Sequence, residues 1–196
     1  DHSHVTSATG TADVGIGNSN GSATVKITGN SRVETVTGGK TGIGMITGIT
    51  DITIDGSQVD TVTGNGGAGI GVLGGEATVT INNGKISTVT GNGGAGIGSG
   101  NGAWADVTIE DSKLDTVTGK GGTGIGAGTG GRGGVTIKGS VLGSVTGEQG
   151  AGIGGGSLAE ILFENSSVTN AIGKQGAGIG GQGKATVTIS GGKITT

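Results

Sequence analysis

Apolar residues recur along the chain in three registers that keep step with one another. One register is the isoleucine of a Gly-Ile-Gly segment, which appears as Ile16, Ile43, Ile70, Ile97, Ile125, Ile153 and Ile179. A second register holds pairs such as Val79/Ile81, and a third holds pairs such as Ile86/Val89. Because the spacing stays at 26–28 residues over seven repeats, the pattern predicts a repeat architecture.

Each repeat contains three short runs in which apolar residues alternate with Thr or Gly, as in 78–81, 87–90 and 95–98. Alternation with a period of two and many β-branched residues are typical of strands. Gly and Asn clusters separate the runs and predict turns. The sequence therefore predicts an all-β fold, a right-handed parallel β-helix (β-solenoid) of about seven coils, with three short strands per coil. We expect one solenoid domain over 5–196 after a flexible N-terminus over 1–4.

Composition narrows the classes of function. The 196 residues include 52 Gly, one Trp and one Phe, with no Cys or Pro, and the formal net charge is −3. A chain without Cys forms no disulfide and no thiolate metal site. No apolar stretch is long enough for membrane insertion, and the sparse charge argues against nucleic acid as a partner. We expect no cofactor and no metal.

The Gly-Ala-Gly-Ile-Gly segment follows a Val-Thr-Ile run and a Thr-Val-Thr run. In this it resembles the glycine-rich GAGIG repeats of bacterial extracellular parallel β-helix proteins, which include surface and adhesin-type repeats and carbohydrate-binding domains. The resemblance covers roughly residues 5–194 and implies an extracellular or cell-surface location. Some of those repeats carry Gly-Asp-Gly-Ile and are associated with calcium. Here Ala68, Ala95, Ala151, Ala177, Thr41 and Thr123 stand where that Asp would be, so the resemblance does not extend to such a site.

Threonines form the first candidate functional surface. If the valine of each Thr-Val-Thr run points inward, both of its neighbours point outward and stack from coil to coil. Two columns spaced about 6.8 Å along the strand and about 4.8 Å between coils would result. Such a ladder is reminiscent of the ice-binding face of β-solenoid antifreeze proteins, although Thr is also a common stabilising residue on sheet surfaces. The candidates are Thr35, Thr37, Thr61, Thr63, Thr88, Thr90, Thr116, Thr118, Ser144 and Thr146.

Glycines and one aromatic residue form the second candidate surface. If Ile70 and its equivalents point inward, the flanking glycines would make a bare outer strip that another backbone or a ligand could approach. Trp104 lies in a loop beside that strip and could stack on a sugar ring or anchor a partner. The alternative is that the apolar loop residues cover the strip. The candidate partner or glycan contacts are Trp104, Gly69, Gly71, Gly96 and Gly98.

The chain begins and stops in the same register, at Val5 and Ile194, and neither end shows a capping unit. Uncapped strands are templates for other strands. Two interpretations are open: a segment of a longer repeat protein, or a subunit that associates end to end with copies of itself.

We find no residue pattern that predicts catalysis. Arg32 and Arg132 lie far apart with no acid cluster near either, and the densest acid group, Asp106, Glu110 and Asp111, is not marked as catalytic. The leading hypothesis is a non-catalytic structural or adhesive β-solenoid, which could be a filament subunit or a surface repeat module. Ice binding is the first alternative, and binding of a surface glycan is the second.

Overall fold

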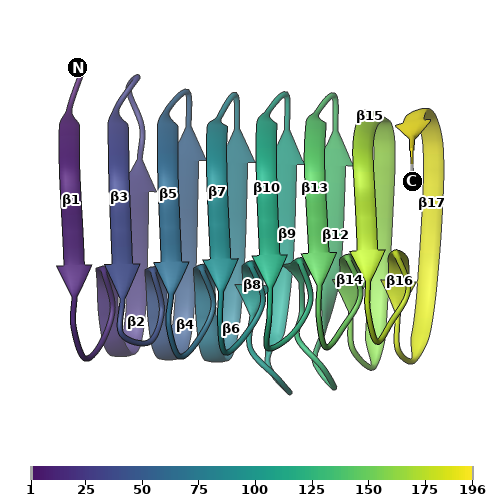
Figure 1. Cartoon of the computed structure of the whole chain (residues 1–196), viewed down its shortest axis with the longest axis horizontal. Coiled ribbons are helices and arrows are strands. Elements are labelled where there is room, and N and C mark those ends of the chain that lie inside the picture. The colour runs from purple at the N-terminus through teal and green to yellow at the C-terminus, as the bar shows by residue number, and fades with distance from the viewer. Residues whose placement is uncertain (1, 196) are drawn as a thin grey trace.

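The computed structural model describes residues 2–195 and is a stack of about seven coils (Figure 1). All strand pairs are parallel, and the described residues contain no helix. Figure 1 shows the front strands running down and the back strands running up as the chain advances, which makes the solenoid right-handed. The prediction of an all-β parallel solenoid is therefore confirmed.

A row of parallel strands forms the front of the molecule in Figure 1. Consecutive members pair with each other in parallel over most of their length, so equivalent residues of successive coils stack directly. This front row consists of β1 (His4–Gly10), β3 (Arg32–Gly38), β5 (Gln58–Gly64), β7 (Lys85–Gly91), β10 (Lys113–Gly119), β13 (Val141–Gly147) and the second half of β15 (Leu158–Gly173).

A second row lies behind the first, and its strands also pair in register. This back row consists of the later parts of β2 (Ile16–Ile27), β4 (Ile43–Asp55) and β6 (Ile70–Asn82), then β9 (Trp104–Glu110), β12 (Arg132–Lys138), the first half of β15, and β17 (Lys184–Ile194).

The Gly-Ile-Gly segments form a third, shorter set of strands that lies between the two rows. A Cβ placed on Gly42 would come within 2.5 Å of Val62 Cγ1 in the front row, and one on Gly44 within 3.1 Å of Ile52 Cδ1 in the back row. These inner strands open β2, β4 and β6, and stand alone as β8 (Ile97–Ser99), β11 (Ile125–Gly126), β14 (Ile153–Gly155) and β16 (Ile179–Gly181).

Short turns connect the back row to the front row at the upper edge in Figure 1, and they have two residues in every coil but the first, where residues 28–31 make the turn. In each turn the residue before the last has a positive φ, which Gly, Asn and Asp adopt at least cost. These residues are Asn30, Gly56, Asn83, Asp111, Gly139, Asn165 and Gly191. The repeated left-handed residue explains why only three residue types occur there.

Serines follow the left-handed residue in most of these turns and form a buried hydrogen-bonded ladder. The Ser140 hydroxyl donates to the Lys138 carbonyl at 2.7 Å and accepts the Ser112 N–H at 3.1 Å. Ser166 repeats the arrangement one coil further on, where it accepts the Ser140 N–H at 3.0 Å. The ladder satisfies N–H groups that the tight turns would otherwise leave unpaired.

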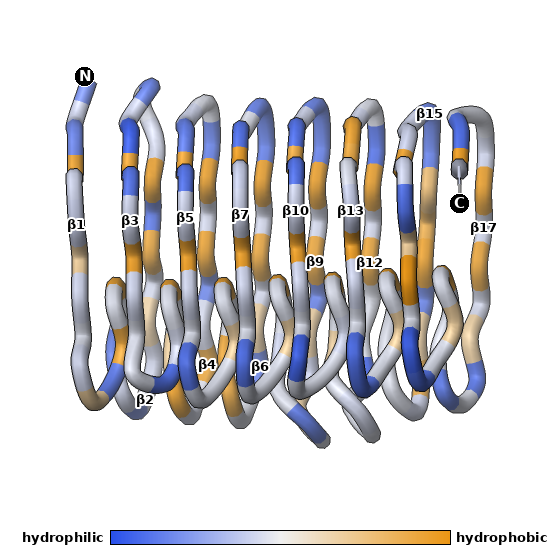
Figure 2. The backbone as a smooth tube through the Cα atoms, viewed as in Figure 1, coloured by the Kyte–Doolittle hydropathy of each residue, from blue (hydrophilic) through white to orange (hydrophobic). Residues whose placement is uncertain are grey.

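The core is a set of apolar columns that run along the whole stack. In Figure 2 the apolar positions line up from strand to strand across the coils. Val62 and Val89 of the front row, Ile81 of the back row, and Ile70 and Ile97 of the inner strands are all fully buried. Stacking like side chains on each other keeps every layer similarly packed, which explains the strict repeat.

The chain enters the first strand one residue earlier than the sequence indicates. His4 already belongs to β1, where it pairs with Arg32, and its Nε2 lies 2.8 Å from Glu34 Oε1. His4 is therefore part of the sheet and not of a flexible N-terminus. His2 and Ser3 are not in a strand, and Asp1 lies outside the described residues.

Candidate functional surfaces

The predicted threonine columns are present on the outer face of the front row. Strand pairing places the candidates in two unbroken columns, each with one residue per coil. The first column is Thr35, Thr61, Thr88, Thr116 and Ser144, and the second is Thr37, Thr63, Thr90, Thr118 and Thr146. Pairing of β1 with β3 adds Ser7 and Thr9, which the Thr-Val-Thr pattern does not predict because Ala8 takes the place of the valine.

The hydroxyls of these columns are available to solvent. Thr35, Thr61 and Thr116 are exposed, and the other seven candidates are partly exposed. Among the described residues no side-chain hydrogen bond involves any of the ten hydroxyls. The columns end on β15, where Asn170 and Ile172 take the two positions. The threonine array is therefore regular over five coils, from β3 to β13.

A charged cluster borders the array at its N-terminal end. Gln58 donates to Asp60 Oδ1 at 2.5 Å, and Arg32 Nη2 donates to Asp60 Oδ2 at 2.7 Å. These two donors hold the pKa of the Asp60 carboxyl below its ordinary value, and the same contact raises the pKa of Arg32. The charges lie on the same outer face as the threonines, so that face is only partly composed of hydroxyls and methyls.

The predicted outer glycine strip is wrong, because Gly69, Gly71, Gly96 and Gly98 are all buried. The Gly-Ile-Gly strands lie between the two rows, so both of their sides are covered. A Cβ on Gly69 would lie 2.5 Å from Val89 Cγ1, and one on Gly71 would overlap the carbonyl oxygen of Gly98. These glycines are required by close packing inside the rod and offer no surface to a partner.

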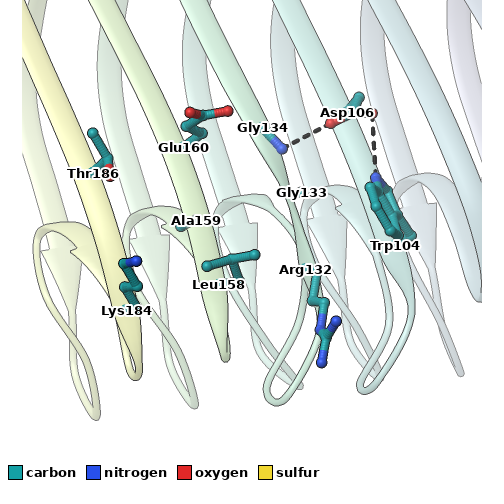
Figure 3. Close-up of a pocket in the computed structure, with 10 residues that line it drawn as sticks. All are labelled: Trp104, Asp106, Arg132, Gly133, Gly134, Leu158, Ala159, Glu160, Lys184 and Thr186. Carbon is teal, nitrogen blue, oxygen red and sulfur yellow. Dashed lines mark hydrogen bonds between the residues drawn. The ribbon is translucent and has the colours of Figure 1, made fainter.

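Trp104 is the part of the second candidate surface that does reach solvent. It opens β9 in the back row, and 48% of its surface is exposed. Its indole Nε1 donates to Asp106 Oδ2 at 3.2 Å, while Asp106 Oδ1 accepts the Gly134 N–H at 2.8 Å. Figure 3 shows Trp104 at one side of a hollow that continues over Gly133 and Leu158.

The two ends of the stack expose residues of the core columns. At the C-terminal end, Val187 and Ile189 of β17 are 40% and 51% exposed. At the N-terminal end a hollow of about 480 Å³ is lined by apolar residues that include Val5, Val25 and Ile27. The interior of the rod is therefore accessible at both ends of the described chain.

The described residues show neither a metal site nor a membrane-spanning helix. No group of three or more His, Cys, Asp and Glu side chains is arranged to hold a metal ion there. Residues 2–195 also form no helix with the length and hydropathy of a membrane span. Comparisons with protein-family models, with curated protein sequences and with solved structures found no match to this chain.

Proposed function

We propose that this chain is a non-catalytic structural module, a rigid β-solenoid rod of an extracellular or cell-surface protein that extends end to end. The observation that supports the proposal is the unbroken in-register pairing of every coil with the next, together with core columns left exposed at both ends. The extracellular location rests on the resemblance to glycine-rich surface repeats.

The two ends carry complementary residues in matching columns. Val187 and Ile189 belong to the same columns as Val25 and Ile27, since each back strand stacks on the next from β2 to β17. A second copy placed with its β2 against β17 would therefore continue the valine and isoleucine ladders. A contact between unlike ends does not close on itself and leads to open chains of molecules.

Residues after Gly192 compete with such stacking. Lys193 and Ile194 pair with Ser167 and Val168, so they begin a further front strand beyond β15. In continuous register, β1 of a second copy would occupy that same place. We therefore expect stacking of the whole chain to be weaker than stacking of a variant that stops at Gly192.

Electron microscopy and sedimentation velocity over a range of concentrations test the proposal. We expect rods that lengthen with concentration, and more so for the variant that stops at Gly192. Ile189→Lys should keep the molecule monomeric, because a buried lysine in the new interface would lack a partner. Val141→Lys, at an exposed apolar position on the flank, is the matched control and should still stack. Monomers of every variant at all concentrations would refute end-to-end association.

The threonine array supports a second candidate function, ice binding. The specific observation is that ten hydroxyls lie in two straight columns, free of side-chain hydrogen bonds among the described residues, on a sheet whose pairing fixes their spacing. A rigid array with repeats of about 4.8 and 6.8 Å can order water in a regular layer. The adjoining Arg32 and Asp60 charges weigh against this function, so we rank it second.

Thermal hysteresis and ice-crystal shaping test this second function. Thr61→Lys combined with Thr88→Lys should abolish both effects, because two long charged side chains would interrupt adjacent rungs of the array. Thr80→Lys combined with Thr108→Lys makes the same change on adjacent rungs of the back row and should leave them intact. The absence of hysteresis in the unmodified chain would exclude ice binding.

A further inference from the structure

The back row loses its regularity at one place, beside Trp104. In the first coils the back-row column that contains Glu76 is reached six positions after the inner isoleucine, as from Ile70 to Glu76. The separation is seven from Ile97 to Trp104 and only five from Ile153 to Leu158. The lengthened connections around Asn101 and Gly130 protrude below the row in Figure 1.

Gly134 opens a notch at this irregularity. The outward column that holds Thr78 and Asp106 continues through Gly134 to Glu160 and Thr186, so one rung lacks a side chain. The notch encloses about 310 Å³, with Trp104 on one side and Leu158 on the other (Figure 3). Trp104 and Leu158 stand two rungs apart, which corresponds to about 9.6 Å.

The Trp104 side chain is preorganised in the free protein by hydrogen bonds. Asp106 bonds to the indole with one oxygen and to the Gly134 N–H with the other, so the side chain is tied to the neighbouring rung. A ring that is already ordered loses little conformational freedom on binding. The exposed indole therefore offers a fixed apolar surface within a polar border.

The border supplies polar groups without partners of their own. None of the ion pairs or side-chain hydrogen bonds of the described residues involves the charged groups of Arg132, Glu160 or Lys184, and all three line the notch. Donors and acceptors thus surround the indole on a shallow surface. Asp106 and Glu160 balance Arg132 and Lys184, so the notch favours neither an anion nor a cation by its net charge.

A second hollow adjoins the notch on the side away from Trp104. This second hollow of about 300 Å³ is lined by Thr136, Leu162 and Thr188 and shares Gly134, Glu160 and Thr186 with the first. The two hollows form one trough across the later coils of the back row. A ligand with several similar units in line would fill the trough better than a single small molecule.

We infer that this trough binds a neutral oligosaccharide, with one sugar ring against Trp104. A pyranose ring has an apolar C–H face that suits an exposed indole and a rim of hydroxyls that suits the unpaired donors and acceptors around it. Because Arg132 and Lys184 offset Asp106 and Glu160, the border gives a phosphate or sulfate group no net attraction, and a neutral ligand fits it best. The inference does not depend on end-to-end stacking, because the trough lies on the side of the rod.

Trp104 fluorescence measures binding directly, because the chain has no other tryptophan. We would titrate the whole chain with neutral hexasaccharides, namely β-1,4- and α-1,4-linked glucose and β-1,4-linked mannose, and with polygalacturonate as an acidic probe. We expect a saturable change with at least one neutral hexasaccharide and a weaker response to polygalacturonate. Failure of all three neutral probes to bind, or tighter binding of polygalacturonate, would overturn the inference.

Gly134→Thr is the decisive variant, because it restores the residue type that the same column has at Thr78 and Thr186. A Cβ on Gly134 meets only Asp106 Oδ1 at 3.2 Å and the Glu160 carbonyl oxygen at 3.7 Å, so the fold should tolerate it. We expect Kd to rise at least about tenfold as the notch fills.

Ile49→Ala, at an exposed apolar position of the Trp104 column outside the trough, is the control and should leave Kd unchanged. Thermal unfolding of both variants establishes that they are folded. A Gly134→Thr chain that folds and binds as tightly as the unmodified chain would place the ligand elsewhere and refute the assignment.

Discussion

Glycine has two opposite roles at the scale of single residues. Gly71 has a φ of +134° and lies against the backbone of the next coil, so no side chain fits there. Gly134 is partly exposed and leaves open a space that a side chain could fill. The first role serves packing and the second creates a surface hollow, although both residues look alike in the sequence.

Gly71→Ala should therefore be severely destabilising. The new Cβ would overlap the Gly98 carbonyl oxygen on a backbone that only glycine adopts readily, and we expect a loss of about 4 kcal/mol or more. Gly74→Ala, where the nearest atom would be Thr47 Cγ2 at 3.7 Å, should change the free energy of unfolding by less than about 1 kcal/mol. Denaturant unfolding of the two variants makes the comparison, and equal losses would contradict the inner placement of Gly71.

Asp60 makes folding sensitive to acid. Its carboxyl pKa is lowered in the folded chain by Gln58 and Arg32, so the unfolded chain binds the proton more readily. The stabilisation is present above the ordinary carboxyl pKa of 3.8 and is lost as the pH falls through the lower, folded value.

Melting temperatures measured from neutral pH down through that range should fall less steeply for Asp60→Asn than for the unmodified chain. The corresponding difference in the free energy of unfolding should be small, about 0.2–1 kcal/mol, because the Arg32–Asp60 ion pair lies at the surface. Identical pH profiles would show that the carboxyl contributes nothing to the acid sensitivity.

The sequence predicts the strands of the two outer rows better than it predicts the inner strands. Two-residue alternation in Thr-Val-Thr and Val-Thr-Ile correctly predicts the front and back rows, because one face of each row is buried and the other is exposed. The same alternation misplaces Gly-Ile-Gly, since a strand between two rows has both faces buried and glycine leaves no polar or apolar signature. The threonine columns were predictable for that reason, and the glycine strip was not.

The serine ladder of the upper turns gives a prediction at this scale. Ser140→Ala would leave the buried N–H of Ser112 without its acceptor, and we expect a loss of about 1–3 kcal/mol. Ser144→Ala removes an outward hydroxyl that takes part in no side-chain hydrogen bond of the described residues, so it should be nearly neutral. Thermal unfolding compares the two, and a neutral Ser140→Ala would mean that water satisfies the turn.

The molecule as a whole is a linear array in which each coil contacts mainly its neighbours. Gln58 and Lys85 occupy the same position in successive coils, so residues 58–84 make one complete turn of the rod. Removing them should leave the register of all other strands unchanged, because stability in such arrays depends on contacts between neighbours.

A chain that lacks residues 58–84 should therefore fold, with cooperative unfolding and a rod about 4.8 Å shorter by small-angle scattering. A chain that lacks only residues 58–69 joins the upper turn to an inner strand and should fail to fold cooperatively. Loss of folding in the first variant would show that the coils are not interchangeable.

The notch beside Trp104 could not be predicted from the sequence of any single repeat. It depends on connections that differ by one or two residues between neighbouring coils, and on Gly134 standing between Asp106 and Glu160 in space. A perfectly regular rod would offer the same binding position at every rung. Here one irregularity marks a single place, about 19 Å from the first back-row rung and about 10 Å from the last. A ligand bound there would be held at one set height along the described stack and could not occupy every coil alike.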